Sequence, residues 1–278
     1  MIPIFTSGLI RKSLQTEREL SMKKLREMKT SPEALRDGLR ENALRHRNYN
    51  MYTAMDRAMC LVLTGNLYIS NGQTWNDKLD RETMQKRSAF GICLSCSTIE
   101  SMAMWMLYSG DKGKNGALVR FLPSIIREIV ESSTVELGKF DDCGKFIQDP
   151  LVLTRKDDHF DIYMTDVVYT DVQKEDPSML IASLGEDHEY MDWQLLEDAG
   201  TFHKHYAWNY EKECRLIVEL SPEIQKEAVK NGFNTVRISL SDASRRALKD
   251  RVIRSPVYAG KTDFGAVSTL YGNVDWKL

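Results

Sequence analysis

The sequence contains no apolar run near the roughly 20 residues that a membrane-spanning helix requires. Its first residues, MIPIFTSGLIRKS, lack the leading basic region and the small-residue cleavage site of a secretion signal. Hydrophobic residues make up 42% of the 278 positions and charged residues 28%, and these values are ordinary for a globular chain. We therefore expect a cytoplasmic protein without a membrane partner.

Cysteine is scarce and unevenly spaced. The five cysteines are an odd number, which argues against a disulfide framework and fits a reducing compartment. Cys93 and Cys96 are the one close pair, but a structural zinc site needs a second pair of this kind. His203 and His205 have no carboxylate nearby at a familiar metal spacing. The sequence therefore predicts buried free thiols and no bound metal.

Familiar catalytic motifs are also absent. The chain contains no nucleophile elbow, no HExxH pair and no set of kinase motifs. The loop SGDKGKNG at residues 109–116 carries two lysines that could neutralise phosphate, but it matches neither a Walker loop nor a dinucleotide fingerprint. We interpret this loop as a turn.

Positive charge gathers near the start of the chain. Residues 11–47 hold eleven Lys or Arg against six Asp or Glu, a net charge of +5, and the total of −2 leaves −7 for the rest. A Ser-Pro-Glu start signal within this segment indicates a helix that follows an earlier amphipathic one. We expect residues 1–47 to form a basic helical arm and residues 48–278 an α+β core domain. The arm either contacts a protein or nucleic-acid partner, or it is a solvated helix face, or it docks on its own acidic body.

Strand and helix patterns alternate without a regular βαβ rhythm, so the predicted fold class is α+β, a mixed and mostly antiparallel sheet with surrounding helices. Met51, Met55, Met59 and Leu63 recur every four residues and predict one buried helix face. The expected strands are residues 67–70, 89–97, 117–121, 162–169, 214–220, 235–240 and 252–259. The expected later helices are residues 99–108, 123–131, 186–197, 221–232, 242–250 and 263–271.

The segment WNYEKECR at residues 208–215 gives the sharpest signal of a polar site. If it runs as a strand, Glu211, Glu213 and Arg215 share one face, and the apolar residues from Cys214 onward share the other. Two carboxylates beside a guanidinium can act as a base or hold a sugar hydroxyl. The alternative is a solvated face with a surface ion pair.

Two further segments carry groups suited to binding. Residues 70–77 place Ser70, Asn76 and Asp77 at a strand end, although such residues also make turns and caps. Trp105 and Tyr108 lie three apart and so share a helix face, which core packing also explains. We expect these side chains to converge with the two glutamates in one pocket.

The same three segments resemble a family. GNLYISNGQTWNDKLD, ICLSCSTIESMAMWMLYSGDKGKNGALVRF and FHKHYAWNYEKECRLIVEL resemble, in this order, the blocks of a large bacterial and phage family catalogued as a domain of unknown function. The resemblance covers roughly residues 49–260 and leaves the basic arm outside. It implies a relationship to abortive-infection proteins and a role in phage defence or phage–host conflict.

That family looks distantly similar to ADP-ribosyltransferases. The similarity implies NAD as substrate, Tyr68 and Ser70 near the nicotinamide ribose, and Glu211 or Glu213 as the catalytic glutamate. The first transferase motif has a His or Arg on an early strand, and residues 49–53 contain neither.

The leading hypothesis is therefore an ADP-ribosyltransferase-like protein or NAD glycohydrolase. Its catalytic residue is Glu213, with Glu211 as the second candidate. We expect Glu213 to be more enclosed than Glu211, and Glu213→Gln to abolish activity with a nearly unchanged melting temperature. The binding residues are then Tyr68, Ser70, Asn76, Asp77, Trp105, Tyr108 and Arg215.

Two alternatives from other classes stay open. The first is a non-enzymatic sensor or binding module that uses the same pocket, with the arm at residues 11–47 gripping a protein or nucleic acid. The second is a nuclease in which Asp77 and the glutamates hold a metal. The sequence is compatible with an oligomer.

Overall fold

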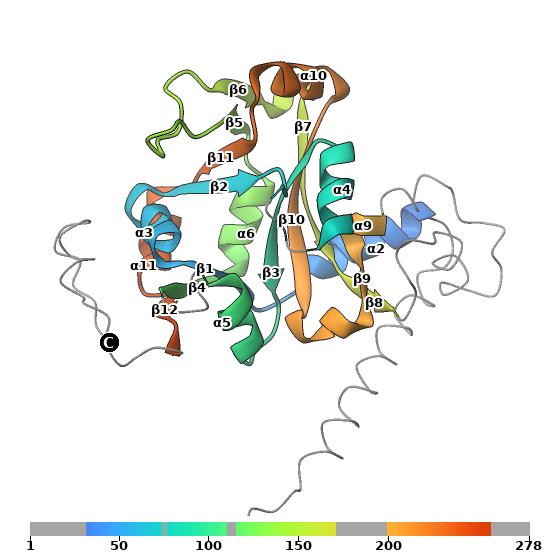
Figure 1. Ribbon diagram of the computed structural model, residues 1–278, viewed down its shortest axis with the longest axis vertical. Helices are drawn as coiled ribbons and strands as arrows, with labels where there is room; N and C mark the ends of the chain where they lie inside the picture. The colour runs from blue at the N-terminus through green and yellow to red at the C-terminus, as the bar shows by residue number, and fades with distance from the viewer. Residues whose placement is uncertain (1–31, 74, 76, 110–114, 171–198, 257–278) are drawn as a thin grey trace, which may run out of the picture.

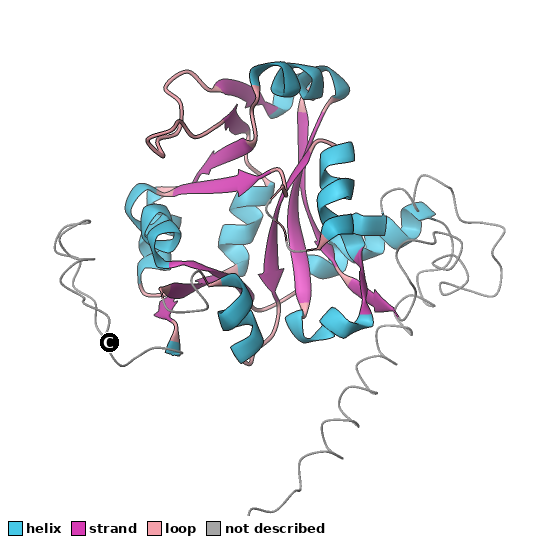
Figure 2. Ribbon diagram, viewed as in Figure 1, coloured by secondary structure: helices cyan, strands magenta, loops and turns pink. Residues whose placement is uncertain are grey.

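The computed structural model describes residues 32–73, 75, 77–109, 115–170 and 199–256. Over these residues the chain builds a ten-stranded sheet, a separate two-stranded sheet and surrounding helices (Figures 1 and 2). The strand pairs of the large sheet are antiparallel, and the small β8–β9 pair is parallel. The predicted α+β class is confirmed.

The elements follow the chain in a mixed order. The strands are β1 (Tyr49–Ala54), β2 (Asn66–Ser70), β3 (Ala89–Ser95), β4 (Gly116–Phe121), β5 (Thr134–Gly138), β6 (Leu151–Thr154), β7 (Phe160–Asp166), β8 (Val168–Thr170), β9 (His203–His205), β10 (Glu213–Leu220), β11 (Thr235–Ser239) and β12 (Val252–Arg254). The α-helices are α2 (Pro32–Ala43), α3 (Met55–Thr64), α4 (Lys78–Lys86), α5 (Met102–Tyr108), α6 (Pro123–Val130), α9 (Ala199–Phe202), α10 (Pro222–Asn231) and α11 (Asp242–Lys249). The 3-10 helices are η2 (Arg155–Asp157) and η4 (Tyr206–Glu211).

The large sheet branches at β3. Its main path runs β12-β4-β1-β3-β2-β11-β5-β6, and β10 also pairs with β3 and carries β7 on its other side. Along β3, Ser95 pairs with both Asn50 and Glu213, while Gly91 pairs with both Ser70 and Ile217. The branch therefore sends β2–β11 and β10–β7 in different directions from one strand, so that apolar faces of the two parts face each other.

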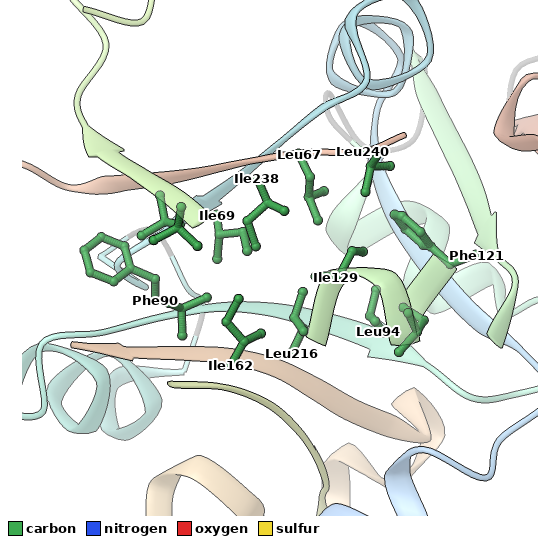
Figure 3. Close-up of a cluster of buried hydrophobic side chains, with 14 of the residues drawn as sticks. Leu67, Ile69, Phe90, Leu94, Phe121, Ile129, Ile162, Leu216, Ile238 and Leu240 are labelled. Atoms are coloured by element: carbon green, nitrogen blue, oxygen red, sulfur yellow. The ribbon is translucent and has the colours of Figure 1, made fainter. Parts of the chain in front are cut away.

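The main core fills the space between these two parts of the sheet. Figure 3 shows side chains of β2 and β11 above those of β3, β7 and β10, with α6 contributing Ile129. The labelled side chains are buried: Leu67, Ile69, Phe90, Leu94, Phe121, Ile129, Ile162, Leu216, Ile238 and Leu240. Alternation along β10 places Cys214, Leu216 and Val218 in this core, as the sequence predicts.

Several predicted boundaries change. Met51 belongs to strand β1, and α3 begins at Met55, so the four-residue methionine spacing crosses a strand–helix junction and the single helix face was wrong. The strand expected at residues 162–169 is divided into β7 and β8. The strand expected at 252–259 is described as β12, and the helix expected at 99–108 begins at Met102.

Helix α2 lies within the predicted basic arm. It packs against β7, with Leu39 and Ala43 buried. Residues 1–31 and the helices expected at 186–197 and 263–271 lie outside the described residues. The division into residues 1–47 and 48–278 stays a prediction. Within the described residues, no helix combines the length and the apolar character needed to cross a membrane.

Candidate functional site

The start of β10 places two glutamates side by side in space. Glu211 ends the 3-10 helix η4, and Glu213 begins β10. Between them, Lys212 has a φ of 46°, a left-handed conformation that turns the chain from helix into strand. The prediction that Glu211 belongs to the strand was wrong, yet both carboxylates reach the same lysine.

Five charged side chains from four elements meet here, and we call them the ion cluster: Asp80, Lys204, Glu211, Glu213 and Arg215. Lys204 Nζ donates to Glu211 Oε2 at 2.5 Å and to Glu213 Oε2 at 2.8 Å. Arg215 Nε donates to Glu213 Oε1 at 2.6 Å, and its Nη2 donates to Asp80 Oδ2 at 2.8 Å. Lys204 Nζ lies 3.8 Å from Asp80 Oδ2, which closes the ring of charges.

The ion cluster is shut off from solvent. Its side chains are 0–5% exposed, because α4 and the α9–β9 segment lie over the face of β10 that turns away from the main core (Figure 1). Trp75 extends this cover, with the guanidinium of Arg215 5.2 Å from its ring centroid. A solvated surface ion pair is therefore wrong for these residues.

Surface exposure does not separate the two glutamates. The side chains of Glu211 and Glu213 are 2% and 3% exposed, so the expectation that Glu213 is the more enclosed stays a prediction. Both carboxylates accept from Lys204 on β9, a contact that a strand-only interpretation does not include.

The two glutamates differ in electrostatics instead. Burial raises the pKa of Glu211, and the neighbouring charge of Glu213 adds to this rise against the opposing effects of Lys204 and Tyr108. Burial also works to raise the pKa of Glu213, but Arg215 and Lys204 outweigh it and hold that pKa well below its usual range. Three carboxylates against two cations leave the ion cluster one negative charge in excess when all are ionised. Of the two glutamates, Glu211 takes up a proton more readily.

Two tyrosines fix the glutamates. The hydroxyl of Tyr108, on α5, donates to Glu211 Oε1. Burial raises the pKa of Tyr108 and the charge of Glu211 raises it further, so the phenol keeps its proton and remains a donor. The backbone N–H of Glu213 donates to the hydroxyl of Tyr169 at 2.8 Å.

Aromatic rings border the ion cluster on the Glu211 side. Lys204 Nζ lies 5.4 Å from the ring centroid of Trp208, and the rings of Trp208 and Tyr210 are 6.1 Å apart. Trp208, Tyr210 and Tyr108 are all half-buried. Flat apolar surfaces next to a carboxylate and an amine are suited to a ligand that has a planar ring and hydroxyl groups.

The segment 70–77 contributes less directly than predicted. Asp77 Oδ1 accepts from the backbone N–H of Asp80 at 3.3 Å, so Asp77 caps the start of α4 and Asp80 supplies the carboxylate to the ion cluster. Ser70 pairs with Gly91 of β3, so its side chain points to the same side of the sheet as that residue. The predicted role of Ser70 in binding stays a prediction. Asn76 lies outside the described residues.

Trp105 and Tyr68 lie elsewhere. The ring of Trp105 packs edge-on against Tyr52 at 5.0 Å, in a small apolar cluster that Tyr108 and Tyr210 border. The ring of Tyr68 packs against Phe140 and Phe146 at 5.0 and 5.4 Å. Of the side chains expected to converge, Tyr108 contacts Glu211, and the common pocket stays a prediction. Tyr68, expected near the nicotinamide ribose, packs against these two phenylalanines instead.

Sequence reasoning missed Asp80 and Lys204. Asp80 stands in the first turn of α4, a helix that the sequence analysis did not predict. Lys204 lies in the block FHKHYAWNYEKECRLIVEL that carries the resemblance, but the local pattern gave it no role. Among the described residues, no group of three or more His, Cys, Asp or Glu side chains is placed to hold a metal ion.

Comparison with known proteins gives one family match. The model of a family described as a protein of unknown function (DUF2971) matches residues 104–216. This range is narrower than the resemblance over residues 49–260, but it includes Tyr108 and, in the ion cluster, all members except Asp80. No curated protein and no solved structure matches the chain.

Proposed function

We propose that this chain is a glutamate-centred enzyme that cleaves the bond between nicotinamide and ribose in NAD, as an NAD glycohydrolase or ADP-ribosyltransferase. The observation that carries the proposal is a pair of buried carboxylates bridged by Lys204, of which Glu211 is bonded to Tyr108 and Glu213 to Arg215. The pKa shifts of the two carboxylates are opposed. Opposed pKa shifts in neighbouring carboxylates assign different roles to them: Glu211 can exchange a proton, whereas Glu213 stays charged.

The contacts favour Glu211 as the catalytic carboxylate. Lys204 donates to both glutamates, but Glu211 is also bonded to half-buried Tyr108 and follows Trp208 and Tyr210 in η4. Glu213 is bonded instead to the fully buried Arg215. Glu213 is then a positioning residue, because its permanent charge holds Lys204 against Glu211. A carboxylate with a raised pKa is also the better general base near neutral pH.

The reaction follows from this assignment. When the C1′–N bond of NAD breaks, its electron pair leaves with nicotinamide, and the ribose carbon becomes an oxocarbenium-like cation. The negative charge of Glu211 stabilises that cation. Water, or a hydroxyl of a target, adds to C1′ and gives its proton to Glu211. With water, the products are ADP-ribose, nicotinamide and one proton.

Substrate access requires a local opening. Glu211 is buried, so the ribose reaches it only when Tyr108 or the η4 segment moves aside. The half-buried rings of Trp208 and Tyr210 then offer a surface on which nicotinamide can stack.

Nicotinamide release tests the proposal. The purified full chain is incubated with NAD, and nicotinamide is followed by chromatography. Release is expected for the natural sequence and is expected to fall by at least 100-fold in Glu211→Gln, since removing a general base and a stabilising charge costs this much. The matched control is Glu219→Gln, on the same strand, whose carboxylate pairs with Arg87 outside the ion cluster. Equal rates in both variants would refute the assignment of Glu211.

The pH profile sharpens the same test. Glu211 acts only when ionised, and its pKa is raised. The rate is therefore expected to climb with pH along an acid limb above the ordinary glutamate value of about 4.3. A limb at the ordinary value would argue against catalysis by this residue.

A second candidate is a non-enzymatic binding module. It is favoured by apolar side chains that α5 and the preceding loop expose, with Ile99 77%, Met102 58% and Leu107 48% exposed. An increase in melting temperature with NAD, without nicotinamide release, would select this candidate. The role in phage–host conflict implied by the resemblance stays a prediction. It would be supported if the expressed chain is toxic to cells and Glu211→Gln abolishes that toxicity.

A further inference from the structure

A second polar cluster lies at the same end of the β3–β10 pair as the ion cluster, but on the opposite, core-facing side of the two strands. The thiols of Cys96 and Cys214 are 2.9 Å apart, and His46 Nε2 lies 2.5 Å from Asp166 Oδ1. His46 is also within hydrogen-bonding reach of Cys96, so the histidine stands between a carboxylate and a thiol. These four side chains are separate from the ion cluster.

The strand register creates this cysteine pair. Cys214 pairs with Leu94 on β3, and the backbone N–H of Cys96 donates to the carbonyl of Lys212 at 2.7 Å. Cys96 and Cys214 are therefore diagonal neighbours on the core side of two adjacent strands. Cys93 pairs with Arg215 on the opposite side, so the Cys93-x-x-Cys96 spacing in the sequence does not bring those two thiols together.

We propose that Cys96 and Cys214 are a redox-active dithiol that closes to a reversible disulfide. The two sulfurs need to approach by only about 0.9 Å to reach a bonding distance of about 2.05 Å. Cys96 is the attacking thiol, because it is half-buried and within reach of His46, whereas Cys214 is fully buried.

Electrostatics agree with these roles. The hydrogen bond between Cys96 and Cys214 lowers the pKa of Cys96 to about 7, with His46 contributing against the effect of burial. The hydrogen bond to Asp166 raises the pKa of His46 to about 10, with Cys96 adding to it, so the imidazole is charged at neutral pH. Tyr49, from β1, completes the groups that surround the imidazole, with its ring 6.1 Å away. Burial raises the pKa of Cys214, as expected of a resolving thiol, which attacks only after Cys96 has formed a mixed disulfide.

The chemistry balances with a small-molecule disulfide as oxidant. The Cys96 thiolate attacks oxidised glutathione, forms a mixed disulfide and releases one glutathione thiolate. Cys214 then gives up its proton and attacks the sulfur of Cys96, which releases the second glutathione. The protein loses two hydrogen atoms, and one oxidised glutathione becomes two reduced molecules. This exchange is independent of NAD cleavage.

Peptide mapping tests the dithiol. The reduced full chain is incubated with oxidised glutathione, digested without reductant and analysed by mass spectrometry. A linkage between the peptides of Cys96 and Cys214 is expected in the natural sequence and equally in Cys93→Ser. In Cys214→Ser, a stable glutathione adduct on Cys96 is expected instead. A Cys93–Cys96 linkage, or adducts on exposed Cys143 alone, would overturn the proposal.

Alkylation kinetics give a second measurement, whose first part uses the natural chain and so does not depend on a variant's folding. In the natural chain, the iodoacetamide labelling rate of Cys96 is expected to rise with pH around a midpoint near 7. In His46→Gln that midpoint is expected to move upward, since the cation beside the thiolate is gone. An unchanged midpoint would remove the role of His46, and a Cys96 that no pH makes reactive would overturn the proposal.

Discussion

The two faces of β10 are equally buried but are held by different forces. On one face, Leu216 and Val218 lie in the main core, 1% and 0% exposed. On the other face, Arg215 is 0% exposed between Asp80, Glu213 and the ring of Trp75. Removal of the apolar face from water stabilises the fold. Removal of the charged face from water is unfavourable, and its ion pairs have to offset that unfavourable free energy.

Because of this difference, a substitution on the charged face should destabilise the fold more than one on the apolar face. A smaller apolar side chain leaves a cavity that neighbours can partly fill, but a missing charge leaves its partners buried and uncompensated. A fold does not need five buried charges to cover one strand, and natural chains concentrate such arrangements at functional sites. The comparison therefore supports a role for the ion cluster beyond packing.

Arg215→Met should give the largest effect. Removing the guanidinium leaves Asp80 and Glu213 with Lys204 as the remaining cation of the ion cluster, and we expect a loss of about 3–5 kcal/mol in the free energy of unfolding. Urea denaturation measures this loss. Arg45→Met, in the exposed pair with Glu41, is the control and should cost less than about 1 kcal/mol. Equal effects of the two variants would show that the ion cluster is hydrated in solution.

Glu213→Gln should have a smaller effect that depends on pH. The structure changes the expectation of an unaltered melting temperature, because Glu213 accepts charged hydrogen bonds from Lys204 and Arg215. We expect a loss of about 1.5–3 kcal/mol at neutral pH, less than for Arg215→Met, since both cations keep another partner.

The sign of this pH dependence follows from the lowered pKa of Glu213. Its contribution is fully present above the unfolded value of about 4.3 and is lost as pH falls through the lower folded value. The difference in melting temperature between the natural chain and Glu213→Gln should therefore be constant from pH 8 to 6 and shrink below about pH 4.3. A difference that grows on acidification would contradict the assigned shift.

Lys212→Gly should give the smallest effect and the opposite sign. A left-handed conformation costs a residue other than glycine about 1–2 kcal/mol, and the extra freedom of unfolded glycine offsets about 0.5–1 kcal/mol of the gain. We expect a net stabilisation below about 1 kcal/mol, measured against Lys212→Ala, which keeps the unfavourable φ. An alanine variant as stable as the glycine variant would mean that the turn relaxes in solution.

Local patterns in the sequence predicted the sheet and the polarity of β10. The alternation from Glu213 to Leu220 assigned Cys214 and Leu216 to the core and Arg215 to the other face, because a strand has a period of two. The same reasoning failed at Glu211, where a 3-10 turn and a left-handed residue replace the strand. Charged residues usually lie in water, so the pattern alone also pointed to a solvated face.

The partners of the charges were not predictable from local pattern. The sequence by itself determined seven of the ten strands of the large sheet, without β1, β5 and β6. It also determined which face of β10 is apolar and that two glutamates and an arginine stand together. Only the tertiary structure decided that Asp80, 135 positions before Arg215, pairs with it, and that Cys96 meets Cys214 rather than Cys93. The physical reason is that backbone periodicity acts over a few residues, whereas ion pairs and thiol contacts depend on how distant strands and helices pack.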